Sequence, residues 1–182
     1  MLLKKAGVAF RVIPSHVAED SQETRPRRLV LELALRKAVS VARRYPKDLV
    51  LGADTIVFCR GEIITKPKNR RDAERILRLL SGSWQRIYTG IALAWEGGNK
   101  TLKDAVATRA LARKLPEDKL LGLIGKHMDK AGAYAVQDKE DPFIARIIGP
   151  RDNVIGLPVA AVKRLMRRAA GTRSMGLRAR RP

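Results

Sequence analysis

The sequence is poor in the residues that build most metal and redox centres. It has one cysteine, Cys59, and two histidines, His16 and His127, among 182 residues. A single cysteine excludes an intrachain disulfide and a zinc site made of cysteines, and it is typical of a reducing cytoplasm. We therefore expect a cytoplasmic protein, and two histidines are too few for most histidine-rich metal centres.

Long apolar runs and familiar nucleotide loops are also missing. No apolar run reaches the roughly 18 residues that a membrane span needs, and no apolar stretch follows the first lysines as in a signal peptide. The sequence contains no Walker loop, no G-x-G-x-x-G and no G-x-S-x-G. Aromatic residues make up 4% of the chain, too few for a convincing base-stacking platform. These absences argue against a membrane protein and against several common enzyme classes.

Acidic residues are scarce beside basic ones, with 18 Asp and Glu against 38 Lys and Arg, and a net charge of +20. Such a charge fits two partners, a nucleic acid or a small polyphosphate substrate. Eight Lys and Arg and no acid lie between Lys163 and Arg181, and Gly171 and Gly176 interrupt that stretch. We expect one domain over residues 1–170 and a basic flexible tail over 171–182. Any nucleic-acid binding is expected to be non-specific and through this tail.

Hydrophobic periodicity predicts an α/β domain with a mixed, largely antiparallel sheet. The chain opens as the end of a helix, followed by a short strand over 9–13 and a polar loop over 14–25. Helices are expected from Pro26 to about Tyr45, after Asn69, over 116–125 and over 159–170. Strands are expected over 48–58, 62–65, 85–95, 101–111, 130–137 and 143–148.

Asp54 is the first anomaly, because it lies inside an apolar strand of residues suited to burial. One interpretation is a bulge or strand end that is open to water. The other is a carboxylate held at a cleft, where it binds a cation or accepts a proton from water. Glu19, Lys37, Lys66 and Gln137 also occupy positions that neither apolar periodicity nor turn chemistry requires.

Singly, each of these polar residues is typical of a solvated surface. Together they supply two carboxylates, two ammonium groups and an amide. Magnesium takes carboxylates, water and phosphate oxygens, lysines offset phosphate charge, and an amide can recognise a base edge. The set therefore matches the needs of a magnesium nucleotide.

Six segments in order resemble motifs of the Maf family of nucleotide pyrophosphatases. The resemblance as a whole spans Val8 to about Met166, and six segments in family order make a chance match very improbable. The segments read L-G-A-D-T-I-V (51–57), G-E-I-I-T-K-P (61–67), L-S-G (80–82), Y-T-G (88–90), K-A-G-A-Y-A-V-Q (130–137) and N-V-I-G-L-P (153–158).

The resemblance implies a Maf/ITPase-like fold, a twisted sheet flanked by helices with a cleft between two lobes. It also implies hydrolysis of nucleoside triphosphates to monophosphate and pyrophosphate with a divalent metal, Mg²⁺ or Mn²⁺. Matched motif by motif, Asp54 is the catalytic acid residue and a metal ligand, and Glu19 helps to hold the metal. Lys37 and Lys66 contact phosphates, while Thr55 and Gln137 select the base, as in the branch that acts on dTTP and UTP. A homodimer is a further possibility.

The chain departs from the family at its start and after Gln137. The family opens with a strand and an S-x-S-P-R-R loop, whereas this sequence starts inside the following helix, so we expect the first strand and phosphate loop to be missing. Asp138-Lys139-Glu140-Asp141 stands where many relatives have glycines. Two alternatives to an active enzyme stay open, namely a catalytically impaired relative and a basic nucleic-acid-binding protein.

Overall fold

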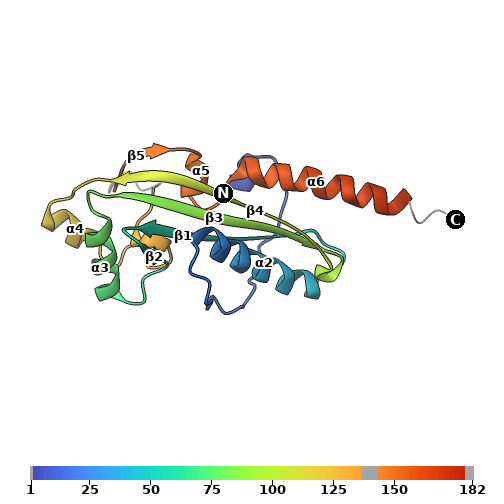
Figure 1. The fold of residues 1–182 in the computed structure, drawn as a ribbon, viewed down its shortest axis with the longest axis horizontal. Coiled ribbons are helices and arrows are strands. Elements are labelled where there is room, and N and C mark those ends of the chain that lie inside the picture. The colour runs from blue at the N-terminus through green and yellow to red at the C-terminus, as the bar shows by residue number, and fades with distance from the viewer. Residues whose placement is uncertain (1, 137–142, 179–182) are drawn as a thin grey trace.

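The computed structural model describes residues 2–136 and 143–178, with side chains described as far as residue 172. Within these described residues, five strands and six α-helices follow one another, with two short 3₁₀ turns between them (Figure 1). In chain order they are α1 (Leu2–Lys5), α2 (Pro26–Arg44), β1 (Val50–Cys59), β2 (Glu62–Ile64), α3 (Arg70–Leu80), β3 (Trp84–Trp95), η1 (Glu96–Gly98), β4 (Lys100–Ala112), α4 (Glu117–Leu123), η2 (Ala131–Ala133), β5 (Ile144–Ile148), α5 (Arg151–Val154) and α6 (Val159–Arg178).

The strands form one open sheet in the order β2-β1-β3-β4-β5. Every strand pair of the described chain is antiparallel, so the sheet is more uniform than the mixed sheet that we expected. β1 pairs with β3 along residues 50–58, but on its other side it pairs with β2 only at residues 57–59. The rest of that edge of β1 has no neighbouring strand in the described chain, and the candidate site lies there.

α2 lies on one face of the sheet and approaches it closely at two glycines. A Cβ on Gly52 of β1 would lie 2.3 Å from the carbonyl oxygen of Ala34, and one on Gly90 of β3 would lie 2.1 Å from that of Val30. Larger residues at these positions would push the helix away from the sheet. The two glycines therefore allow the close distance between α2 and the strands β1 and β3.

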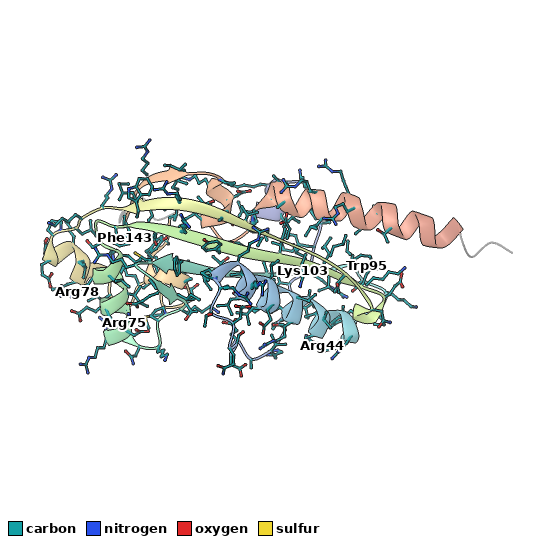
Figure 2. The ribbon with its side chains drawn as sticks, in the orientation of Figure 1. Arg44, Arg75, Arg78, Trp95, Lys103 and Phe143 are labelled. Atoms are coloured by element: carbon teal, nitrogen blue, oxygen red, sulfur yellow. The ribbon has the colours of Figure 1, made fainter. Side chains whose placement is uncertain are left out.

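The opposite face carries the larger apolar clusters. One gathers around α3 and includes Phe143, and the other lies between β3 and α6 and includes Trp95. Both residues are buried, and Figure 2 labels them together with Arg75 and Arg78, which lie on the exposed side of α3. The positive charge is thus spread over the surface and the core is apolar.

Three expected elements differ from the structure. Residues 9–13 form no strand, since Phe10 and Val12 are exposed and no ladder pairs this segment with β1. Residues 130–136 form the turn η2 and a loop instead of a strand, because Gly132 and Ala133 take positive φ values of 83° and 59°. α6 continues to Arg178 instead of ending at Ala170, so Gly171 does not end the helix.

Candidate active site

A cleft of about 360 Å³ opens along the free edge of β1. The residues around it come from the loop before α2, from α2, β1 and β3, from the two residues after β2, and from the segments 129–136 and 154–156. Glu19, Lys37, Asp54, Thr55 and Lys66 all line this cleft. The structure therefore brings together five of the six residues that the sequence predicted, while Gln137 lies outside the described residues.

Asp54 lies on the face of β1 that α2 covers, and its residue is only 9% exposed. Its partner across the sheet is Gly90, which leaves room above it for the helix. Lys37 of α2 donates a hydrogen bond from Nζ to Oδ1 of Asp54 at 2.6 Å. Asp54 is therefore a buried carboxylate that lines the cleft, and not a bulge or strand end open to water.

Lys37 also donates a hydrogen bond to Oε1 of Glu19 at 2.7 Å, so one ammonium group joins two carboxylates. Lys66, just beyond β2, has its Nζ 3.5 Å from the same Glu19 oxygen. Lys37 is mostly covered, whereas Glu19 and Lys66 are about half exposed. The cluster is thus buried at Asp54 and open to solvent at Glu19 and Lys66.

Burial and charge act in opposite directions on these groups. Burial raises the pKa of Asp54 above its ordinary value, although the hydrogen bond from Lys37 opposes the change. Burial alone would lower the pKa of Lys37, but the hydrogen bonds to Asp54 and Glu19 outweigh it and the pKa is raised. The hydrogen bond from Lys37 lowers the pKa of Glu19. Near neutral pH, Lys37 is therefore an ammonium and Glu19 a carboxylate.

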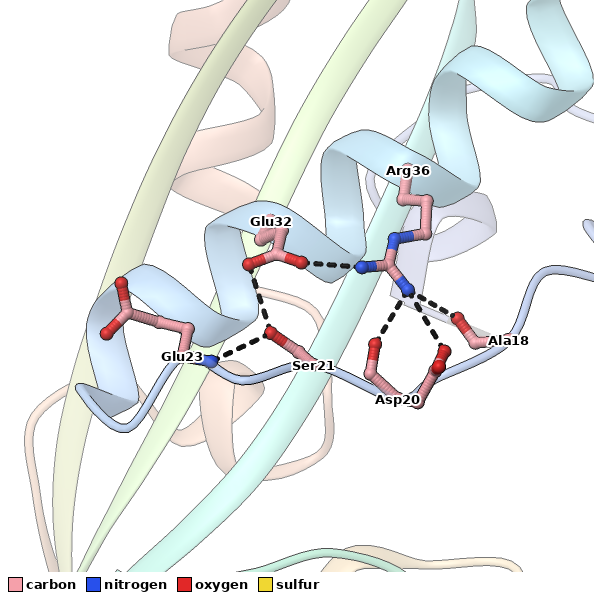
Figure 3. Close-up of polar contacts among 6 residues, drawn as sticks. All are labelled: Ala18, Asp20, Ser21, Glu23, Glu32 and Arg36. Atoms are coloured by element: carbon pink, nitrogen blue, oxygen red, sulfur yellow. Dashed lines mark hydrogen bonds and ion pairs between the residues drawn. The ribbon is translucent and has the colours of Figure 1, made fainter.

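The loop that holds Glu19 is tied to α2 by a polar network (Figure 3). Arg36 of α2 donates from Nη1 to the carbonyl oxygens of Ala18 at 2.9 Å and Asp20 at 2.8 Å, on either side of Glu19. Its Nη2 donates to Glu32 at 2.5 Å, and Glu32 in turn accepts a hydrogen bond from Ser21. Arg36 therefore fixes the backbone on both sides of Glu19, which places that carboxylate beside Lys37.

Thr55 points to the opposite face of β1 from Asp54, as adjacent strand residues must. Its hydroxyl lies 2.9 Å from that of Thr89 on β3, and Thr89 donates to the carbonyl oxygen of Asn153 at 3.3 Å. Asn153 is fully buried and donates from Nδ2 to the backbone of Ile87. These bonds hold the 153–156 segment against the sheet, where Ile155 and Gly156 form one wall of the cleft.

Sequence reasoning about single residues missed further residues of this site. Asp129 and Lys130 line the cleft and form an ion pair at 2.7 Å, and Tyr134 lies deeper, with its hydroxyl donating to Gln85. Lys130 and Tyr134 belong to the K-A-G-A-Y segment, so the motif itself was the signal. Among the described residues there is no group of three or more His, Cys, Asp or Glu side chains that could hold a metal ion.

Comparison with known proteins places these motifs in a family. A family model described as Maf-like protein matches residues 1–169 of this chain. The chain belongs to the Maf-like protein family. The family membership that the ordered motifs predicted is therefore confirmed.

Several proteins similar to this chain are named dTTP/UTP pyrophosphatase. One from Elusimicrobium minutum is 46% identical over 166 residues, which is 91% of this chain and 90% of the relative. Others come from Koribacter versatilis, 40% identical over 92% of this chain and 88% of the relative, and from Deinococcus radiodurans, 37% identical over 97% and 90%. The similarity thus extends over almost the whole of each chain.

Proposed function

We propose that this protein is a nucleoside triphosphate pyrophosphatase that hydrolyses dTTP and UTP to the monophosphate and pyrophosphate. The observation that carries the proposal is the buried Asp54 carboxylate, held by the Lys37 ammonium at the base of a cleft that Lys66 borders. The names of the relatives support the choice of pyrimidine nucleotides. Thr55 and the Gln137 position are the proposed base-selecting residues.

The chemistry of the cleft suits an attack by water on the α-phosphate. Asp54 accepts the proton from that water, and burial suits it to the task because a raised pKa makes a carboxylate a stronger base. Lys37 and Lys66 offset the charge that develops on the phosphate oxygens, and the mostly covered Lys37 acts more strongly than the half-exposed Lys66 because less water screens it. Arg36 keeps Glu19 in place through the loop backbone.

We also propose that Glu19 and Asp54 would hold a divalent cation, Mg²⁺ or Mn²⁺. One oxygen of each carboxylate contacts the same nitrogen, Nζ of Lys37. The two carboxylates are therefore close enough to share a positively charged ligand. Two carboxylates are the protein ligands that Mg²⁺ commonly uses, with phosphate oxygens and water filling its other positions. When bound, such an ion polarises the phosphate and neutralises its charge.

Three further properties belong to this proposal. Within the described chain, no helix has the length and apolar character to cross a bilayer. We place the protein in the cytoplasm, where its nucleotide substrates are, and a homodimer is compatible with this role. Non-specific nucleic-acid binding through the basic C-terminal residues is the rival function, but by itself it gives no role to Asp54 and Glu19, whose charge repels phosphate.

The proposal is tested by measuring pyrophosphate release from dTTP, UTP, GTP and 7-methyl-GTP with Mg²⁺ and with Mn²⁺. We expect the two pyrimidine nucleotides to give the highest kcat/KM. A preference for 7-methyl-GTP would contradict the base assignment. If the protein hydrolysed none of the four nucleotides, the alternative of a catalytically impaired relative would be favoured.

A further inference from the structure

The face of the sheet that α2 covers near Asp54 extends past the first turn of that helix. Leu29 and Val30 of α2 pack over Ile56 of β1 and Ala105 of β4. On the same face, toward the start of β3, Trp84 and Arg86 are exposed. On the other face of that strand, Gln85 and Ile87 are buried. This end of the sheet is therefore covered on one face and open on the other.

Strand register shows which side chains share the open face, because partners across an antiparallel pair point the same way. Arg86 of β3 lies opposite Phe58 on one side and Arg109 on the other, and Arg109 lies opposite Ile148 of β5. The next row contains Trp84, Leu111 and Arg146. We call these residues the open sheet face: Phe58, Trp84, Arg86, Arg109, Leu111, Arg146 and Ile148.

The open sheet face is positively charged and partly apolar. Within the described chain, Arg86, Arg109 and Arg146 have no carboxylate at ion-pair distance, unlike Arg75 and Arg78 on α3. Arg86 and Arg109 are direct cross-strand partners, and like charges in that arrangement destabilise a sheet. An anionic partner would remove this repulsion.

An aromatic ring lies among these charges. Trp84 is 39% exposed, and the Arg109 guanidinium lies 4.8 Å from the centre of its ring. Ile148 is also exposed, at 45%, so the face offers both a flat stacking surface and an apolar contact. Aromatic rings and arginines together bind single-stranded nucleic acids, whose bases stack while their phosphates pair with cations.

We propose that the open sheet face binds single-stranded nucleic acid, with a base stacked on Trp84 and phosphates held by Arg86, Arg109 and Arg146. A second copy of this chain fits less well, because a symmetric contact would oppose the same arginines from both copies. An acidic protein would satisfy the arginines but has no need of the exposed tryptophan ring. The chain has few aromatic residues, yet one of its two tryptophans lies here.

The site differs from the basic C-terminal region that the sequence singled out, and it is separate from the cleft of the proposed function. The proposal therefore does not depend on pyrophosphatase activity. Variants of the open sheet face should hydrolyse dTTP as the natural protein does, whether or not they bind nucleic acid.

The test measures fluorescence anisotropy of a labelled oligothymidylate of about 20 nucleotides, longer than typical sites of 4–16 nucleotides. The double variant Arg86→Gln/Arg109→Gln is compared with Arg167→Gln/Arg168→Gln, which removes the same charge from the exposed side of α6. We expect the first to weaken binding at least about tenfold at low salt and to reduce the log–log salt slope by about 1.4, as two lost phosphate contacts predict. The α6 variant should bind within about twofold of the natural protein, because its arginines lie outside the proposed contact.

Tryptophan fluorescence provides the second readout. Trp84 is exposed and Trp95 is buried, so stacking of a base should quench Trp84 alone. Trp84→Phe should abolish the quenching and keep most of the affinity, whereas Trp95→Phe should keep the quenching. Equal loss in both arginine variants, or equal affinity for duplex DNA, would show diffuse electrostatic attraction and overturn the proposal. Equal competition by polyglutamate would point to an acidic protein, and self-association lost in Arg86→Gln/Arg109→Gln would point to a second copy.

Discussion

Lys37 determines the charge of the candidate site because it joins both carboxylates. Its ammonium lies 2.6 Å from Asp54 and 2.7 Å from Glu19, while only Asp54 is deeply covered. Burial favours the protonated form of Asp54, and the neighbouring ammonium favours the carboxylate. The balance leaves Asp54 as a base with a raised pKa, which is the state that proton abstraction from water needs.

The first prediction concerns Asp54 itself. Asp54→Asn keeps the shape of the side chain but removes its charge and basicity, so kcat for dTTP should fall by about 10²–10⁴. Circular dichroism should show an unchanged fold. Asp104→Asn is the matched control, since Asp104 lies on β4 and pairs with Arg27 and Arg164 outside the cleft. Similar losses in both variants would contradict a chemical role for Asp54.

The second prediction concerns pH. The base must be ionised, so kcat/KM should be lost as the pH falls through the raised pKa of Asp54. Lys37→Met removes the hydrogen bond and charge that oppose this rise, so the acidic limb should move to higher pH. Lys66→Met is the control and should move it less, because Lys66 exerts a smaller effect on Asp54. If the acidic limb of the pH profile moved equally in both variants, Lys37 would not be the main group that opposes the rise in the pKa of Asp54.

Residues of the site were predictable where a polar group interrupts a strong pattern. Asp54 in an apolar strand and Lys37 in an apolar helix signal such a site, and the structure places them in contact. Asp129 gives no such signal, because an acid in a polar loop is ordinary. That Thr55 points away from Asp54 follows from strand alternation, but its pairing with Thr89 depends on register, which single residues do not reveal.

At the scale of elements, α2 sets the geometry of the cleft. It carries Lys37 above β1, and its Arg36 holds the Glu19 loop. Its distance from the sheet is fixed at Gly52, where an added Cβ would meet Ala34 at 2.3 Å and the backbone nitrogen of Ala38 at 2.7 Å. Both contacts are with helix backbone, which has no flexible end that could move aside.

Gly52→Ala should therefore destabilise the protein and impair the site together. Overpacking of this kind costs about 1–3 kcal/mol, and in a chain of this size each kcal/mol lowers Tm by about 2–4 °C. The displaced helix should also lower kcat/KM, because Lys37 moves with it. Gly122→Ala is the control, since nothing lies within 4 Å of its added Cβ. Calorimetry and dTTP kinetics test both variants, and an unchanged Tm in Gly52→Ala would show that α2 is free to shift.

Element prediction succeeded where local signals agree and failed where tertiary contacts decide. Asn69 caps α3 through a hydrogen bond from the Asp72 backbone, and Pro26 begins α2, as the sequence indicated. The 9–13 segment is apolar apart from Arg11, but it has no strand partner in the described chain. The strand expected over 130–137 is wrong in its described part, 130–136, because Gly132 and Ala133 turn the chain so that Tyr134 packs against Phe143.

At the scale of the whole molecule, α6 is the element that projects beyond the sheet. Figure 1 shows α6 running on past the end of the sheet. Its last buried side chain among those described is Ala169, and Ala170, Gly171 and Thr172 are exposed. The helix is thus longer than the expected segment 159–170, and the three residues after Ala169 whose side chains are described are exposed.

Removing residues 171–182 should therefore leave the fold and the cleft intact. The truncated chain loses four arginines, Arg173, Arg178, Arg180 and Arg181, which lowers the net charge of +20 by four. Because the helix packs through residues up to Ala169, we expect Tm to change by less than about 2–4 °C, the equivalent of one kcal/mol. The kcat/KM for dTTP should also stay unchanged. A larger fall in Tm would show that the end of α6 is docked.

The same truncation separates the two basic regions. Four lost charges should weaken the salt-sensitive attraction to any polyanion, single-stranded or duplex alike. Quenching of Trp84 by oligothymidylate should persist at saturating concentrations, because the ring and its arginine lie on the sheet. If quenching disappears with the tail, the C-terminal arginines hold the strand. If it persists there but is lost in Arg86→Gln/Arg109→Gln, the sheet holds it and the tail adds only long-range attraction.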